Sequence, residues 1–308
     1  MKIVILDADT LGKCDLGEIE KLGSLTIYPS TKREQTLERC QGAEIVITNK
    51  VVLDKEILSE LPDLKLICIS ATGMNNVDLV YAKERGIAVK NVAGYSTTSV
   101  AQHTLTMALS LLAQIGYYDD YCKSGQWCKS EIFVHINEGL REIEGLKWGI
   151  IGLGSIGKRV AQIVSCFGAK VHYYSTSGKN NDSTYTQQSL KELLSTNDII
   201  SIHAPLNDQT KNLLNRENLP LLKPQAILIN VGRGGIVNEA DIAEILKTKE
   251  MYFATDVLES EPMKPNHPLL DTSIAHKLLL TPHVAWAYDN ARERLLKLLA
   301  QNIRDFIG

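Results

Sequence analysis

The chain has 308 residues, which is enough for two domains of ordinary size with separate cores. Its hydrophobic content of 44% and charged content of 22% are typical of a soluble globular protein. The net charge of −3 lacks the basic excess of proteins that bind nucleic acid or acidic membranes through bulk charge, so these classes are excluded. Small anionic ligands therefore have to be held by local sites.

The N-terminus leads from Met1 into a short apolar run that Asp7 interrupts, too short and too soon acidic for a signal peptide. No run approaches the roughly 20 apolar residues of a membrane helix. The six cysteines are scattered without metal-ligand spacing, which predicts reduced thiols and no metal site. We therefore expect a cytoplasmic protein with no nucleic acid or membrane partner.

Apolar runs alternate with helix-like segments along the chain, a pattern that predicts parallel sheets with helices on both faces. In the first half the expected strands are Ile3–Leu6, Leu25–Tyr28, Glu44–Thr48, Leu64–Ile69 and Ile87–Lys90, and the expected helices are Thr31–Cys40, Asp54–Leu61 and Val77–Arg85. In the second half the strands are Lys170–Tyr174, Asp198–Ile202, Ala226–Asn230, Tyr252–Thr255 and Lys277–Thr281, with helices at Ser189–Ser195 and Glu239–Lys247. The sequence therefore predicts an α/β protein with two doubly wound parallel sheets. A last helix, Ala287–Phe306, would make the first domain discontinuous if it returned there.

Between the two series lies a helix, Val100–Ile115, that is apolar on nearly every side. Ser99 with Gln102 has the form of a capping box at its start. Such a helix is either buried inside one domain or crosses between domains and packs on a second subunit; we favour the second interpretation. His103 on this helix is interpreted as a core or interface histidine. We interpret the following segment, Tyr117–Leu140, as an irregular connection or arm without chemistry.

A glycine turn, GLGSIG, stands between a predicted strand, Leu146–Ile151, and a predicted helix, Ser155–Phe167. This context favours a dinucleotide-binding turn over a chance match. Gly152 would make the sharp turn, Gly154 would let the backbone approach a pyrophosphate, and Gly157 would let the helix pack closely on the strand. The free N–H groups of the helix N-terminus would then face the phosphates.

Polar residues follow three strand ends of the second series, where ligands of open α/β sheets bind. Arg233 lies in a glycine loop, Glu261 in an acidic loop that begins at Asp256, and His283 directly after a proline. Each alone is compatible with a solvated surface residue. Together they indicate a carboxylate clamp, a partner for the histidine and a proton donor.

At this point the chain resembles the D-isomer-specific 2-hydroxyacid dehydrogenases, and within them the glycerate dehydrogenase (hydroxypyruvate reductase) group. The resemblance runs over nearly the whole length. Its motifs, in order, are Ala71–Asp78, Ser99–Gln102, Gly152–Gly157, His203–Leu206, Val231–Gly234, Asp256–Pro262 and Thr281–His283.

The resemblance implies a Rossmann dinucleotide-binding domain, residues 98–286, inserted in a flavodoxin-like substrate-binding domain, residues 1–97 and 287–308. It also implies a homodimer joined through the helix after Ser99. The implied activity is reversible reduction of a small 2-oxo acid, of the hydroxypyruvate or glyoxylate type, to the D-2-hydroxy acid. A D-lactate or broad-specificity dehydrogenase is an alternative, as is a nucleotide-sensing binding protein of the corepressor type.

By matched position, the resemblance implies three catalytic residues. Arg233 would hold the substrate carboxylate and orient the carbonyl, His283 would be the acid/base, and Glu261 would pair with it. The implied substrate contacts are Thr72, Gly73, Met74, Arg233 and His283. The implied cofactor contacts are Gly152, Gly154, Ser155, Ile156, Gly157, Ser175, His203, Ala204, Pro205, Val231, Gly232, Asp256 and Ala285.

One departure concerns the cofactor. NAD-binding turns usually have a carboxylate about twenty residues after the first glycine, to hold the ribose hydroxyls. Here the predicted strand is followed by Ser175–Lys179, which contains no acid. We expect NAD, with serine hydroxyls serving its ribose; the alternative is NADP, with these hydroxyls and Lys179 around a 2′-phosphate.

Overall fold

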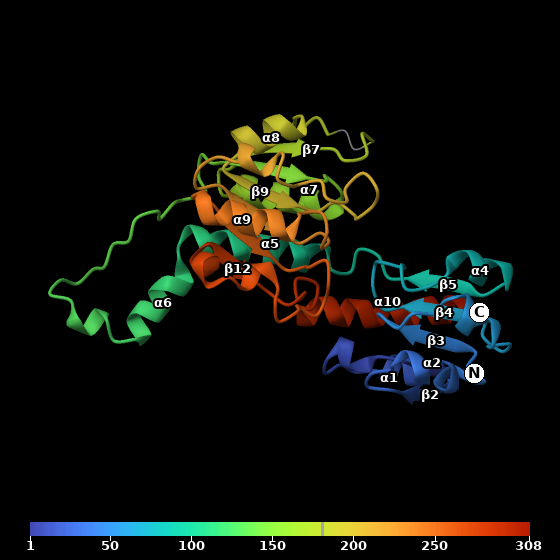
Figure 1. The fold of residues 1–308 in the computed structure, drawn as a ribbon. Coiled ribbons are helices and arrows are strands. Elements are labelled where there is room, and N and C mark those ends of the chain that lie inside the picture. Colours follow the sequence, from blue (N-terminus) through green and yellow to red (C-terminus); the bar gives the residue numbers. More distant parts are fainter. Residues whose placement is uncertain (180–181) are drawn as a thin grey trace. The chain divides into compact units, whose positions relative to one another are not determined.

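The computed structural model describes residues 1–179 and 182–308 and consists of two compact units. Unit 1 comprises Met1–Ser96 and Trp286–Gly308, and unit 2 comprises Thr97–Ala285. Both are α/β structures in which parallel strands alternate with helices (Figure 1). The predicted fold class, with two doubly wound parallel sheets, is therefore confirmed.

Unit 1 is built on a five-stranded sheet of order β2-β1-β3-β4-β5, with every neighbouring pair parallel. This is the flavodoxin-like strand order. Its strands are β1 (Lys2–Ile5), β2 (Ser24–Ile27), β3 (Ile45–Thr48), β4 (Leu66–Ile69) and β5 (Ala88–Asn91). Its helices are α1 (Gly17–Glu20), α2 (Arg33–Cys40), α3 (Lys55–Ser59), α4 (Leu79–Glu84) and α10 (Asp289–Ile307), with a 3-10 helix, η1, at Ala8–Leu11.

The two faces of this sheet bury different segments of the chain. One face packs against α3, α4 and the connections around them, all from the first 96 residues. The other packs against the apolar side of α10, which lies along the sheet in Figure 1. The α10 residues in this core are Ala291, Leu295, Leu296, Leu299, Ala300 and Ile303. Spacings of three and four place them on one side of the helix.

Unit 2 is built on a seven-stranded parallel sheet of order β12-β11-β10-β9-β6-β7-β8. From β8 to β11 this is the Rossmann order, to which β12 adds a strand. The strands are β6 (Lys147–Ile151), β7 (Lys170–Tyr174), β8 (Thr186–Gln187), β9 (Ile199–Ile202), β10 (Ile227–Asn230), β11 (Tyr252–Thr255) and β12 (Leu278–Leu280). The helices are α5 (Thr97–Leu112), α6 (Ile115–Lys123), α7 (Ser155–Cys166), α8 (Leu190–Thr196) and α9 (Glu239–Thr248). Short 3-10 helices lie at Trp127–Lys129 (η2), Leu219–Leu221 (η3), Pro268–Leu270 (η4) and Thr272–Lys277 (η5).

Two local predictions are wrong. Helix α5 begins at Thr97, so Ser99 is a buried residue of the first turn and not its N-cap. The segment Tyr117–Leu140, predicted as an irregular connection or an arm, is irregular only in part, because helix α6 (Ile115–Lys123) continues into it as far as Lys123. No residue of α6 is buried. The helix therefore lacks the apolar periodicity by which a helix is recognised in a sequence.

No helix in the described part of the chain has the length and apolar character needed to cross a membrane. Within residues 1–179 and 182–308, no three His, Cys, Asp or Glu side chains are placed to hold a metal ion together. All six cysteines are free thiols.

Candidate active site

The predicted site residues of unit 2 lie along one edge of its sheet. Six of them follow the carboxyl end of a strand by one to three residues, and in a parallel sheet these ends share an edge. In the order β12, β11, β10, β9, β6 and β7, the residues are His283, Asp256, Arg233, His203, Gly152 and Ser175. The acid–base candidates therefore lie at the β10 to β12 half of the edge, whereas the glycine turn, His203 and Ser175 lie at the half formed by β6, β9 and β7.

The glycine turn has the geometry that the three glycines predict. Gly152 has a φ of +91°, and a Cβ there would lie 2.8 Å from the backbone nitrogen of Ala204. A Cβ on Gly157 would lie 2.4 Å from the carbonyl oxygen of Gly152, which shows how closely α7 approaches the turn. A Cβ on Gly154 would enter open space. The turn thus leaves room beside Gly154 at the N-terminus of α7, whose first two residues are Ser155 and Ile156.

Two buried polar atoms near this turn have no hydrogen-bond partner in the described structure. One is Oγ of Ser175, a residue that is 7% exposed, and the other is Nδ1 of His203. Nε2 of His203 lies 3.0 Å from Oγ of Ser201, and burial lowers the pKa of His203 to about 3, so the ring is neutral. Unpaired buried polar atoms are costly unless a ligand satisfies them. The residues present therefore fit a dinucleotide whose phosphates lie at the glycine turn.

The turn after β10 is fixed by one side chain. Asn230 donates from Nδ2 to the carbonyl of Arg233 at 2.9 Å and accepts the N–H of Gly232 at 3.1 Å. The exposed guanidinium of Arg233 donates from Nη1 to the Gly232 carbonyl at 2.8 Å, which leaves its other donors available for a ligand. Val231 in the same turn is buried. A Cβ on Gly234 would collide with the backbone of Leu258, so the turns after β10 and β11 are in contact.

His283 and Glu261, the predicted acid–base pair, are in direct contact. Nδ1 of His283 lies 2.7 Å from Oε2 of Glu261, and Oε1 of Glu261 accepts the N–H of Leu258 at 2.9 Å. Because an ionised carboxylate only accepts hydrogen bonds, Nδ1 is the donor, and Nε2 is left to exchange a proton with a substrate. His283 has a φ of +55°, which is unusual for a residue with a side chain.

The carboxylate of Asp256 is used inside the protein. Asp256 is 2% exposed, and its oxygens accept the N–H groups of Val284 at 2.8 Å and Ala285 at 2.9 Å. Oγ1 of Thr281 donates to it at 2.5 Å. This residue, predicted to lie by the nicotinamide, thus also fixes the turn that carries His283. Thr281 was not among the predicted site residues, although it directly follows β12.

The predicted substrate contacts Thr72, Gly73 and Met74 belong to unit 1, in the connection after β4. Thr72 donates from Oγ1 to the carbonyl of Val92 at 3.2 Å, and its own carbonyl accepts Nδ2 of Asn91 at 2.6 Å. These bonds tie the connection to the end of β5 and give it a defined backbone.

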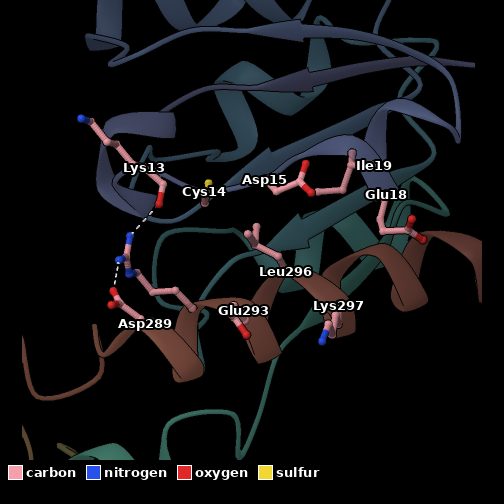
Figure 2. A pocket seen from close by; sticks show the side chains of 10 residues that line it. Lys13, Cys14, Asp15, Glu18, Ile19, Asp289, Glu293, Leu296 and Lys297 are labelled. Atoms are coloured by element: carbon pink, nitrogen blue, oxygen red, sulfur yellow. Dashed lines mark hydrogen bonds and ion pairs between the residues drawn. The ribbon is translucent and has the colours of Figure 1, made fainter.

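Unit 1 also has a pocket, which lies away from Thr72, Gly73 and Met74. Figure 2 shows it between α10 and the segment around α1. Arg292 spans it, donating from Nη1 to the carbonyls of Leu11 at 3.0 Å and Lys13 at 3.1 Å and from Nη2 to Asp289. We interpret it as a seam where α10 is fastened to the N-terminal segment. The residues that line it are Lys13, Cys14, Asp15, Glu18, Ile19, Asp289, Arg292, Glu293, Leu296 and Lys297.

Comparison with known protein families gives one match, to the NAD-binding domain of the D-isomer-specific 2-hydroxyacid dehydrogenases, over residues 105–285. Among relatives, a glycerate dehydrogenase of Methylorubrum extorquens is 36% identical and covers 100% of this chain and 96% of its own. A hydroxypyruvate reductase of Blautia hydrogenotrophica is 33% identical, with 100% and 97% covered.

Solved structures of two enzymes are similar to this chain over its full length. A D-lactate dehydrogenase of Aquifex aeolicus, complexed with NAD and lactic acid, has a TM-score of 0.85 at 27% identity and covers 100% of this chain and 95% of its own. An acyclic imino acid reductase, Bsp5, in complex with NADPH and D-Arg has a TM-score of 0.87 at 28% identity, with 100% and 97% covered.

Proposed function

This chain belongs to the D-isomer-specific 2-hydroxyacid dehydrogenases, and from that premise we propose that it reduces a small 2-oxo acid of the hydroxypyruvate or glyoxylate type to the D-2-hydroxy acid. The observation that carries the proposal is the pair of His283 and Glu261 on the same sheet edge as the glycine turn and Arg233. It combines a proton donor, its carboxylate partner and a cation for the substrate in a nicotinamide-dependent dehydrogenase.

The chain's own residues account for the proton and for the charge. Arg233 binds the substrate carboxylate with the donors not used by Gly232 and stabilises the negative charge that develops on the keto oxygen. Nε2 of His283 donates a proton to that oxygen, and Glu261 holds the ring in place through Nδ1. In the direction of oxidation, the same nitrogen accepts the proton from the hydroxyl group.

The cofactor would lie along the whole edge, with its phosphates at the glycine turn. Ser155, Ile156 and Gly157 offer backbone N–H groups to the pyrophosphate at the start of α7. Ser175 and the His203–Pro205 segment border the adenosine half, and the residues near β10 to β12 border the nicotinamide, namely Val231, Gly232, Asp256 and Ala285. When bound, the reduced nicotinamide supplies the hydride that goes to the keto carbon.

We assign backbone groups of unit 1 to substrate binding. Backbone groups of Thr72, Gly73 and Met74 would cradle the substrate carboxylate, while unit 2 provides the cofactor site and the acid–base pair. We therefore assign residues 1–97 and 287–308 to the substrate-binding domain and residues 98–286 to the dinucleotide-binding domain.

A panel of 2-oxo acids tests the proposed function. Purified protein is given hydroxypyruvate, glyoxylate or pyruvate with NADH or NADPH, and cofactor oxidation is followed at 340 nm. We expect turnover, highest with hydroxypyruvate or glyoxylate; a preference for pyruvate would reassign the chain to the D-lactate dehydrogenases. No oxidation with any acid, together with partner capture that requires the cofactor, would favour a nucleotide-sensing protein instead.

We also propose a homodimer. Helix α5 exposes Gln102, Thr106 and Leu109 at helical spacing, and the segment after α6 exposes Phe133 at 87% and Ile136 at 76%. Apolar side chains that exposed are typical of a surface covered by another chain. Light scattering after gel filtration should give twice the chain mass, and Phe133→Asp should lower it; a monomeric wild type would contradict the proposal.

We propose a cytoplasmic location, in keeping with six free thiols, which persist in reducing compartments. Fractionation of the source cells should find the protein with cytoplasmic markers.

A further inference from the structure

A buried histidine on α5 contacts the turn that carries the proton donor. His103 is 8% exposed, and its Nε2 lies 3.1 Å from Oγ1 of Thr281 and 3.7 Å from Oδ1 of Asp256. His103 and Thr281 are 178 positions apart in the chain, yet both belong to unit 2. The backbone carbonyl of Thr281 also accepts the N–H of His283 at 3.1 Å.

The hydrogens of this contact can be assigned. The carboxylate of Asp256 only accepts, so Thr281 donates its single hydroxyl hydrogen to Asp256 at 2.5 Å. The Thr281 oxygen can then only accept from His103, which places a hydrogen on Nε2 of His103. Burial lowers the pKa of His103, so this hydrogen belongs to a neutral ring at physiological pH. The order of donation is thus from His103 to Thr281 to Asp256.

Asp256, which this hydrogen bond orients, is itself bonded to the backbone of His283 and of the two residues that follow it. Its side chain accepts the N–H groups of Val284 and Ala285, and its own carbonyl accepts the N–H of His283 at 2.8 Å. His283 has the left-handed φ of +55°, which a residue with a side chain adopts only when its surroundings enforce it. The hydrogen bonds of Asp256 supply that enforcement.

We propose that His103 is a positioning residue for the proton donor: through Thr281 it orients the Asp256 carboxylate that holds the His283 turn in its left-handed conformation. The inference rests on the proposed function, because it assigns His283 the proton transfer. It predicts that the N–H of His103 affects the rate of the chemical step and leaves cofactor binding unchanged.

The experiment compares His103→Leu, which removes the donor, with His103→Gln, whose amide can still donate. Removing the donor should lower kcat about tenfold or more, with KM and the Kd of NADH each within about twofold, since small misplacements of a catalytic group cost about that much. The glutamine variant should keep kcat within about threefold of wild type. Equal loss in the two variants would overturn the proposal.

A double-mutant cycle tests the route, and its Thr281→Val arm can be measured whether or not His103→Leu folds. Thr281→Val removes the hydroxyl link and should lower kcat by a similar factor. Because His103 acts through Thr281, the double variant should be no slower than Thr281→Val alone. If the losses of kcat in the two single variants multiply in the double variant, His103 does not act through Thr281 and the proposal is overturned.

A matched control separates positioning from general stability. His172 in β7 is also partly buried and bonds a side chain, with Nδ1 2.7 Å from Oδ1 of Asn197. His172→Leu should lower Tm but leave kcat per folded molecule within about twofold. If His103→Leu does the same, its role is structural and the inference fails. If wild type reduces no 2-oxo acid, the proposed function fails first.

Discussion

The two halves of the unit 2 sheet edge are built in different ways. In the half at β7, β6 and β9, glycines leave room beside the backbone, and Ser175 and His203 each bury an unpaired polar atom. In the half at β10 to β12, the carboxylates of Asp256 and Glu261 are hydrogen-bonded within the chain. In the described structure the first half leaves buried polar atoms for a ligand to satisfy, whereas the carboxylates of the second half are held by hydrogen bonds within the chain. Such preorganised charge is what a proton-transfer step requires.

The largest expected effect is a loss of kcat with no change in the binding of NADH. His283→Asn removes the proton donor and should lower kcat by about a thousandfold, within the range that general acid catalysis contributes. The Kd of NADH, measured by fluorescence, should remain within about twofold because His283 is not among the residues assigned to the cofactor. Turnover near that of wild type would assign the acid to another group.

The partner of the proton donor comes next. Glu261→Gln keeps an oxygen near Nδ1 of His283 but replaces a charged acceptor with a neutral one, which weakens the hydrogen bond that holds the ring, so kcat should fall about a hundredfold. Glu259→Gln is the control, since Glu259 is in the same loop but is exposed and matches no catalytic position. A similar loss in both variants would mean that the loop as a whole is sensitive, and Glu261 would lose its specific role.

Acid should destabilise the folded protein through His203, whose Nδ1 has no hydrogen-bond partner in the described structure. The pKa of His203 is about 3 in the folded protein and about 6.5 when unfolded, so below pH 6.5 the unfolded state binds the extra proton and stability is lost as the pH falls. Between pH 7 and pH 5 this costs about 2 kcal/mol of unfolding free energy.

Urea unfolding at the two pH values checks this. His203→Gln should remove that part of the loss, whereas His276→Gln, at an exposed histidine, should behave as wild type. The same pH dependence in the His203 variant would show that other groups cause it.

The glycine turn offers a pair of variants that differ only in where the new methyl group lies. Gly157→Ala places it against the Gly152 carbonyl and should lower the unfolding free energy by about 1–3 kcal/mol. Gly154→Ala places it in open space and should keep Tm but weaken NADH binding about tenfold, because the methyl group fills room needed by the phosphates. Unchanged NADH binding in Gly154→Ala would move the pyrophosphate elsewhere.

The smallest effect concerns the choice of cofactor. Ser175→Asp adds the carboxylate that this turn lacks, which should favour the ribose hydroxyls of NADH and repel a 2′-phosphate. The ratio of the Kd values for NADPH and NADH should rise about fivefold, as for a single partly solvated charge. Ser177→Asp, at an exposed position, is the control. If Ser177→Asp changes the ratio as much, Ser175 is not the selective position.

The sequence predicts the parts of the fold that have a strong apolar pattern. The strand predicted at Tyr252–Thr255 is found with the same bounds, because its buried residues give a clear signal. Strand β8 has only two residues, both exposed, and α6 buries none, so neither carries a pattern that a sequence could show.

For the site, the sequence predicts which loops carry polar residues, because each follows a strand end. It could not show that Glu261 meets His283 at 2.7 Å or that His103 reaches Thr281. Such contacts join residues far apart in the chain, and their geometry depends on how the sheet brings the loops together. His103 was accordingly interpreted as a core or interface histidine.

The packing of α10 sets an order for folding during synthesis. Unit 2 is continuous, so it can fold as soon as its last residues leave the ribosome. One apolar face of the unit 1 sheet packs against α10, which is synthesised after the whole of unit 2. At about 5–20 residues per second, roughly 10–40 seconds separate the synthesis of β5 from that of α10. During that interval the face around Ile3, Ile45 and Leu66 is open to chaperones and to aggregation.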